Sequence, residues 1–326
     1  MRALLAVLVS LVLALAVSAC GSDDSDSKSS DSGGGGEKAG SEIKKNPANS
    51  GKSLTVGSKN FTEQYILGEI YVQALQAAGY KVKKDLDLGS EQIAYKALKG
   101  GQIDGYPEYT GTSLTSFFKI KTDAVPKDPD KAYQEAKAKY AKQGITALAR
   151  TKFENTYKVG TTKDIQKDKL GGATKLSELK PDEVAKLKLA GFPECRQRTD
   201  CYLGLQRNYK LKPEFVSTEQ TYAALDNGQA ELAAVFSTDG KLTSGKYTVI
   251  EDDKGLFPPY NISFGIDTKK LKELGPDAEK VIVDVQKGLT LKNMQNLNSR
   301  VDIDKDKPAE VARLYLESEG FIKKGS

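Results

Sequence analysis

The sequence predicts an α/β fold built from two similar units. Strand-like apolar segments alternate with helix-like segments from Ser53 onward, and a second alternating set begins near Tyr157. Such alternation is typical of a largely parallel sheet with helices on both faces. The part expected to fold, residues 53–322, is longer than one typical hydrophobic core, which favours two domains or one large domain.

The first set of elements follows from apolar segments and from the residues that begin and end helices. A short apolar segment at 54–56 predicts a strand. Asn60, with Glu63 three residues later, predicts a capping box at the start of a helix that stops at Gly79. Further elements are expected at 81–88 (strand), 91–98 (helix) and 102–105 (strand).

The second set repeats this alternation. Strands are expected at 186–190, 214–216, 232–236, 248–250 and 262–266. Helices are expected at 131–142, 202–209, 221–225, 278–287 and 309–319.

One internal echo relates the two sets. The segment beginning at Ala97, "ALKGGQIDGYPEYTG", aligns without gaps with the segment beginning at Ala224, "ALDNGQAELAAVFST", and it places Tyr109 opposite Phe236. Each aromatic is expected just past the carboxyl end of a strand, where open α/β sheets bind ligands. Two such units facing each other would form a cleft.

The N-terminal segment is predicted to direct export. A positive start, an apolar run at 3–17 and small residues before Cys20 are typical of a secretory signal peptide, here residues 1–19. Ending at Cys20, it resembles a bacterial lipobox; a plain signal peptide with a coincidental cysteine is the alternative. Residues 20–52 are rich in Ser, Gly, Asp and Lys, so we expect a lipidated cysteine followed by a flexible tether, outside the cytoplasm.

Composition removes several function classes. The net charge of +5 is spread among 49 basic and 44 acidic residues without a basic block, which argues against a nucleic-acid partner. The chain has no histidine, the usual general base and the commonest metal ligand. We therefore expect no enzyme activity, no cofactor and no metal, although carboxylate pairs such as Asp104 and Glu108 leave a hydrolase as a rival.

Cys195 and Cys201 form a near pair in an exported chain, which favours a small structural disulfide. Two free thiols or a redox site are the alternatives. The spacing is not C-x-x-C and so does not favour redox chemistry.

Four motifs resemble those of the solute-binding proteins of ABC importers for quaternary-ammonium osmoprotectants, the glycine betaine, proline betaine, carnitine and choline class. They are "VGSKNFTEQYILGEI", "IDGYPEYTGT", "FSTDGK" and "EDDKGLFPPY". The resemblance implies a two-lobed periplasmic-binding fold, type II-like, that closes around ligand and delivers it to a permease. The implied lobes are 53–152 with 262–326, and 153–261, in a chain expected to be monomeric.

The resemblance also implies an aromatic cage. Tyr109, Tyr157 and Tyr260 match cage positions, and Phe236 stands where a tyrosine is usual. A trimethylammonium group has no N–H, so aromatic faces hold it by cation–π attraction of roughly 0.5–2 kcal/mol per contact. Core packing is the alternative for each of these rings.

A betaine also carries a carboxylate. In the family, residues matching Lys59, Thr112 and Arg198 bind it, and an acid matching Glu194 helps to position the pocket. Arg196 takes the place of Arg198 in a slipped alignment, and solvated surface charge is the alternative for both basic groups. Another small zwitterion or an amino acid is the alternative ligand.

Overall fold

Strands in residues 40–325, the part of the chain that this computed structural model describes, form two five-stranded sheets. The strand order is β2-β1-β3-β10-β4 in the first sheet and β7-β6-β8-β5-β9 in the second. We call each sheet with its attached helices a lobe. The first lobe combines the N-terminal and C-terminal stretches of the chain, because β10 pairs with β3 and β4.

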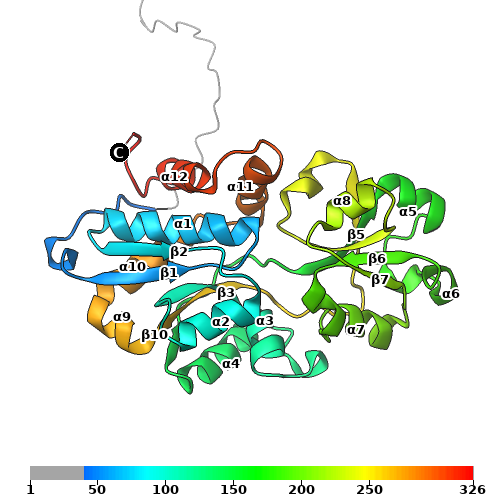
Figure 1. Ribbon diagram of the computed structural model, residues 1–326, viewed down its shortest axis with the longest axis horizontal. Coiled ribbons are helices and arrows are strands. Elements are labelled where there is room, and N and C mark those ends of the chain that lie inside the picture. Colours follow the sequence, from blue (N-terminus) through cyan, green and yellow to red (C-terminus); the bar gives the residue numbers. More distant parts are fainter. Residues whose placement is uncertain (1–39, 326) are drawn as a thin grey trace, which may run out of the picture. The chain divides into compact units, whose positions relative to one another are not determined.

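In the first lobe the strands are β1 (Ser53–Gly57), β2 (Lys81–Asp85), β3 (Gly105–Tyr109), β4 (Ile145–Ala147) and β10 (Ile262–Asp267). Its helices are α1 (Thr62–Ala77), α2 (Glu91–Lys99), α3 (Thr110–Thr112), α4 (Pro129–Ala141), α9 (Thr268–Leu274), α10 (Pro276–Val285), α11 (Leu291–Asp302) and α12 (Pro308–Ser318). Helices α1 and α12 cover one face of the sheet, and α2 and α4 cover the other (Figure 1).

In the second lobe the strands are β5 (Tyr157–Thr162), β6 (Lys188–Gly191), β7 (Glu214–Ser217), β8 (Leu232–Phe236) and β9 (Tyr247–Ile250). Its helices are α5 (Lys163–Lys169), α6 (Pro181–Val184), α7 (Tyr202–Gly204) and α8 (Thr221–Asp226). The α/β class predicted from the sequence is confirmed.

Both sheets are mixed: four strands of each run in one direction, as expected for a largely parallel sheet, and one strand is reversed. Strand β10 runs antiparallel to β3 and β4, and β5 runs antiparallel to β8 and β9. The reason lies in the two connections between the lobes, residues 148–156 and 251–261. The first connection reaches the second sheet beside the last residue of β8, so β5 starts there and runs antiparallel to β8. The second returns to the first sheet beside the last residue of β3, so β10 runs antiparallel to β3.

Side chains alternate between the two faces of a central strand, as the period of a strand requires. In β8, Leu232 and Ala234 pack in the main hydrophobic core, whereas Ala233 and Val235 pack in a separate cluster with residues of α8. The near-continuous apolar sequence of β8 therefore follows from burial on both faces.

Strand β3 occupies Gly105–Tyr109, later than the predicted strand at 102–105. Gly105 and Pro107 resemble turn residues, yet all five residues are buried, paired in antiparallel register with β10. Proline is tolerated because β3 forms only one bridge to β1, at Gly105, and the Pro107 carbonyl accepts a hydrogen bond from Gln64 Nε2 at 2.9 Å.

Helix α1 begins without the predicted capping box. Phe61 is its extended N-cap and makes no side-chain cap, so the prediction for Asn60 was wrong. Glu63 is buried and accepts a hydrogen bond from Tyr109 at 2.8 Å instead. This acid therefore supports the edge of the sheet rather than the start of the helix.

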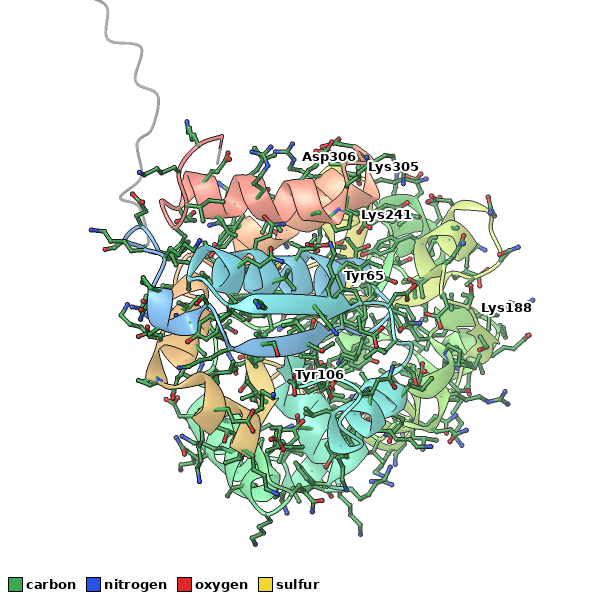
Figure 2. The ribbon with its side chains drawn as sticks, turned by 60° about the vertical axis from the view of Figure 1, so that its left-hand side comes forward. Tyr65, Tyr106, Lys188, Lys241, Lys305 and Asp306 are labelled. Atoms are coloured by element: carbon green, nitrogen blue, oxygen red, sulfur yellow. A yellow bond between two sulfur atoms is a disulfide. The ribbon has the colours of Figure 1, made fainter. Side chains whose placement is uncertain are left out.

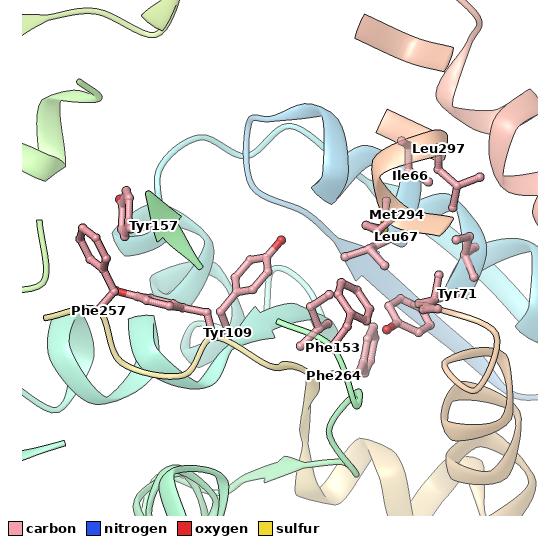
Figure 3. Packing of buried hydrophobic residues seen from close by; sticks show 14 of the residues in the cluster. Ile66, Leu67, Tyr71, Tyr109, Phe153, Tyr157, Phe257, Phe264, Met294 and Leu297 are labelled. Carbon is pink, nitrogen blue, oxygen red and sulfur yellow. The ribbon is translucent and has the colours of Figure 1, made fainter. Parts of the chain in front are cut away.

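The C-terminal helices complete the first lobe by packing on α1 (Figure 1). Met294 and Leu297 of α11 lie with Ile66 and Leu67 of α1 in the core, with Tyr109 at the end of this packing nearest the second lobe (Figure 3). Among residues 40–325, no helix has both the length and the apolar character needed to span a bilayer.

Candidate ligand-binding site

A cavity of about 70 Å³ lies where β3 and β8 end and β5 begins. One water needs about 10–15 Å³ of such space, so the cavity has room for a small molecule. Its lining includes all eight side chains predicted to contact ligand: Lys59, Tyr109, Thr112, Tyr157, Glu194, Arg198, Phe236 and Tyr260. Their binding of a ligand remains a prediction.

Five aromatic rings of the lining form a continuous series. Phe61 lies 6.2 Å from Tyr109 and 6.2 Å from Phe236, measured between ring centroids. Tyr157 then lies 4.6 Å from Phe236 and 5.7 Å from Tyr260, the latter pair edge to face. The series draws rings from both lobes around one space.

Strand register fixes four of these rings. Tyr109 ends β3 opposite the first residue of β10, and Tyr260 lies just before that strand. In the second lobe, Phe236 ends β8 in register with Tyr157, the first residue of β5. Tyr109 and Phe236, which the sequence alignment placed opposite each other, are therefore the last residues of β3 and β8. Each of these strands is third in the order of its sheet.

Hydrogen bonds behind the rings hold Tyr109 in place. Its hydroxyl donates to Glu63, which also accepts from Asn155 Nδ2 at 2.9 Å and from Asn298 Nδ2 at 3.2 Å. Burial raises the pKa of Glu63, although these donors favour its charged form. Burial also raises the pKa of Tyr109 well above its usual value, so the phenol stays neutral.

Lys59 is buried beside the cavity and forms an ion pair with Glu108. Its Nζ lies 2.6 Å from Glu108 Oε1 and 4.5 Å from the centroid of the Tyr109 ring. Glu108 is buried and also accepts a hydrogen bond from the Tyr106 hydroxyl at 2.7 Å. Asp104, the other acid of the rival hydrolase hypothesis, accepts from the Thr55 backbone amide at 2.7 Å, on a different set of partners from Glu108.

Arg198 enters the cavity from the second lobe and is anchored by Asp200. Its Nε and Nη2 donate to the two Asp200 oxygens at 2.9 and 2.6 Å, and Nη1 donates to Glu91 at 3.2 Å. The Tyr260 hydroxyl donates to Asp200 as well. Burial opposes the charge of Asp200, but the Arg198 guanidinium holds its pKa below the usual value.

The disulfide Cys195–Cys201 closes the loop that carries Arg198 and Asp200. Of the two arginines considered from sequence, Arg198 lines the cavity, whereas Arg196 is exposed and lies outside the lining.

Two further predicted residues line the cavity without polar partners in the described part of the chain. Thr112 is buried, and its hydroxyl makes no hydrogen bond with residues 40–325. Glu194 lies near Glu219, and burial together with the Glu194 charge raises the pKa of Glu219. Cys20, the predicted lipidation site, lies outside the described residues.

Sequence reasoning missed two aromatics of the lining, Phe61 and Phe192. The Phe192 ring lies 5.6 Å from that of Phe236. Both residues follow the carboxyl end of a strand, Phe61 after β1 and Phe192 directly after β6. Applying the strand-end rule to every predicted strand would have found Phe192, whereas Phe61 lies four residues beyond β1 and needed the fold.

The arrangement suits binding better than bond cleavage. Aromatic faces attract a cation, and tyrosine and arginine side chains supply orienting polar groups. Within residues 40–325, no group of three or more His, Cys, Asp or Glu side chains could hold a metal ion.

Two mixed α/β lobes with an aromatic cavity at their strand ends define a solute-binding protein of the two-lobed type. The particular family follows from its sequence model: the chain belongs to the family described as the substrate-binding domain of the ABC-type glycine betaine transport system, matched over residues 52–318. Members are extracytoplasmic transport proteins that work with permease subunits, not enzymes.

Similar proteins agree with this assignment. The glycine-betaine-binding protein of Pseudomonas aeruginosa is 33% identical over 84% of this chain and 90% of its own length. The glycine betaine-binding protein YehZ of Escherichia coli is 27% identical over 85% of this chain and 94% of its own. A crystal structure of a glycine betaine/carnitine/choline ABC transporter superposes with a TM-score of 0.66 at 26% identity, covering 81% of this chain and 97% of the other.

Proposed function

We propose that this chain binds a small quaternary-ammonium solute of the glycine betaine and choline class and delivers it to the membrane subunits of an ABC importer. The observation that carries the proposal is the series of five neighbouring rings, from both lobes, around one cavity. The names of the similar proteins, which bind glycine betaine, support the same class.

The number of rings matches what a quaternary ammonium group needs. Micromolar binding requires about 8 kcal/mol. One cation–π contact supplies roughly 0.5–2 kcal/mol, so several rings must act together with burial of the methyl groups. Because the cavity is lined on several sides by rings, a trimethylammonium group could touch more than one face at once.

The side chains fall into two proposed groups. The cage consists of Tyr109, Tyr157, Phe236 and Tyr260. The groups placed around the polar end of the ligand are Lys59, Thr112, Glu194 and Arg198.

Closure of the lobes is the proposed working step. We divide the moving units at 152/153 and 261/262, within the two connections between the sheets. Two hydrogen bonds join the units so divided: Thr115 of the first lobe donates to Asp200 of the second at 2.8 Å, and the Thr122 hydroxyl donates to Thr199 at 2.6 Å.

We also propose that the chain acts as a monomer held to the membrane by lipid on Cys20. The tether expected at 20–52 must end before residue 40, because residues 40–52 pack on the first lobe: the Ile43 amide donates to the Phe321 carbonyl at 2.8 Å and the Asn46 amide donates to the Ala78 carbonyl at 3.0 Å. One acyl chain gives only reversible attachment, so stable anchoring requires more than one chain on this cysteine.

Thermal unfolding with a ligand panel tests the proposed function. A ligand at 100 times its Kd adds about 2.7 kcal/mol of stability. We expect choline, glycine betaine or carnitine to stabilise the native chain. Tyr157→Ala should lose this effect, whereas Tyr202→Ala should keep it, since Tyr202 packs on Phe215 in the same lobe and does not line the cavity. Stabilisation by amino acids alone would contradict the proposal.

A further inference from the structure

We propose that the polar end of the cavity is built for a ligand hydroxyl rather than a ligand carboxylate, so that the chain selects a monocation such as choline over a zwitterion such as glycine betaine. This inference rests on the proposed function, because it takes a quaternary ammonium group as the part of the ligand held by the rings. It follows from which charges and hydrogen-bonding groups of the lining already have partners.

Arg198, the natural partner for a ligand carboxylate, already holds a carboxylate of the chain. Asp200 accepts from its Nε at 2.9 Å and from its Nη2 at 2.6 Å, the paired geometry in which arginine grips a carboxylate. Glu91 accepts from the remaining nitrogen, Nη1, at 3.2 Å. Two carboxylates therefore already neutralise the guanidinium, and a betaine carboxylate could reach only the N–H groups that they leave unused, close to the buried charge of Asp200.

Lys59, the second cation of the lining, is committed in the same way. Its Nζ lies 2.6 Å from Glu108, and the two side chains are 5% and 2% exposed. The ammonium also faces the Tyr109 ring at 4.5 Å, which leaves little of its charge for a ligand anion.

The carboxylates of the lining outnumber its cations, and two of these carboxylates have no ion-pair partner in the described residues. Glu91, Glu194 and Glu219 face the cavity together with Lys59 and Arg198. Neither Glu194 nor Glu219 forms an ion pair or hydrogen bond with residues 40–325. The remaining potential is negative, which attracts a cation and repels a ligand carboxylate.

One buried acceptor among the lining residues also lacks a donor in the described part of the chain. Asn155 lines the cavity and is 4% exposed; its Nδ2 donates to Glu63 at 2.9 Å, but its Oδ1 has no hydrogen-bond partner in the described residues. A buried acceptor left unpaired costs about 1–3 kcal/mol. The oxygen is itself shielded, so a choline hydroxyl would donate to it after a small rotation of the amide, whereas glycine betaine has no donor to offer. The Thr112 hydroxyl can donate or accept and suits either ligand.

Titration calorimetry with choline chloride and with glycine betaine, at one ionic strength, tests the inference on the native chain. We expect a choline Kd lower by about tenfold or more. Equal or tighter binding of glycine betaine would overturn the inference and leave the proposed function intact. Binding of neither ligand would overturn both.

Two sets of variants test the stated cause. The double change Glu194→Gln with Glu219→Gln should reduce the choline preference about threefold or more, whereas Glu310→Gln, at an exposed position of α12, should leave it unchanged. Asp200→Asn should strengthen glycine betaine binding relative to choline, because it removes the buried carboxylate that neutralises Arg198. If Asp200→Asn does not fold, the glutamine pair decides alone: an unchanged preference overturns the inference.

Discussion

Tyr157 and Phe236 face each other in register across β5 and β8, with ring centroids 4.6 Å apart. Backbone pairing therefore fixes this wall of the cavity independently of any ligand. Phe236 is partly exposed to the cavity, so its ring can be changed without rebuilding the buried core.

Substitutions at Phe236 separate cation–π attraction from simple apolar contact. Phe236→Leu keeps apolar bulk but removes the ring, so binding of a quaternary amine should weaken about tenfold. Phe236→Tyr should bind about as tightly or a few-fold more tightly, because a tyrosine face also attracts a cation. Titration calorimetry measures both effects. Phe215→Leu, in β7 and outside the cavity lining, is the control; unchanged affinity in Phe236→Leu would argue against the cage.

Gly240→Ala should weaken ligand binding by opening the contact between the second lobe and α11. A Cβ at Gly240 would lie 2.3 Å from the backbone nitrogen of Ser299, which cannot move without shifting the helix. Nearby, Gln295 donates to the Ser237 carbonyl and Asn298 to the Thr238 carbonyl, both at 2.8 Å. We expect an affinity loss of about fivefold or more, consistent with the cost of overpacking.

The control for this prediction is Gly51→Ala, since a Cβ at Gly51 meets no atom within 4 Å. The ligand affinity from calorimetry, and the ligand's stabilising effect in thermal unfolding, should be lower for Gly240→Ala than for Gly51→Ala. The cleft beside this contact is lined by Lys241 from the second lobe and by Tyr65 and Lys305 from the first, and Figure 2 shows the three side chains on one side of the molecule. Equal binding by the two variants would show that the contact is not needed for the bound state.

Asp239 should make stability depend on pH. Removal of its carboxylate from water, with smaller contributions from Asp302 and Glu63, raises its pKa to about 7, against donors from the Phe236 backbone and Tyr222. The folded chain thus keeps a proton that the unfolded chain releases near pH 4. The free energy of unfolding should therefore fall as the pH rises from about 4 to about 7.

Asp239→Asn should flatten this part of the curve, measured as urea unfolding at several pH values. Asp226→Asn is the contrast, because Lys246 and Tyr247 hold the Asp226 pKa below its usual value, and its contribution is lost only at lower pH. Identical slopes for the native chain and Asp239→Asn would contradict the assignment.

Replacing Cys195 and Cys201 by serine should weaken both stability and binding. The disulfide spans a sequence separation of 6, and closing so short a loop is worth about 2 kcal/mol on the chain-entropy model. The loop also carries Arg198 and Asp200, so its loosening should raise the Kd for ligand. Chemical unfolding and calorimetry measure the two effects; a stability loss with unchanged Kd would show that the loop holds its shape without the bond.

Strand-end aromatics were predictable because they follow from local patterns. The echo between the segments at Ala97 and Ala224 relates Tyr109 to Phe236, and the structure places both at the end of the third strand of a sheet. The position of β3 was not predictable in the same way. Gly105 and Pro107 indicate a turn locally, and the pairing that makes them a strand comes from β10, far along the chain.

The partners of the charged residues lay beyond sequence reasoning for the same reason. Lys59 and Glu108 lie 49 residues apart in sequence, and the hydrogen bond from Tyr260 to Asp200 spans 60 residues. Helix α11 was also not predicted: only Met294, Leu297 and Asn298 are buried, which gives a weak apolar pattern. Its place becomes clear only from its contacts with α1 and with the second lobe.

Titration of the native chain with choline and with 3,3-dimethylbutan-1-ol tests the central claim most directly. The two molecules share one shape, but the second has a neutral carbon where choline has the quaternary nitrogen. If aromatic faces hold a cation, choline should bind about 30-fold or more tightly, corresponding to roughly 2 kcal/mol from several rings. Equal affinity for the neutral molecule would contradict the account.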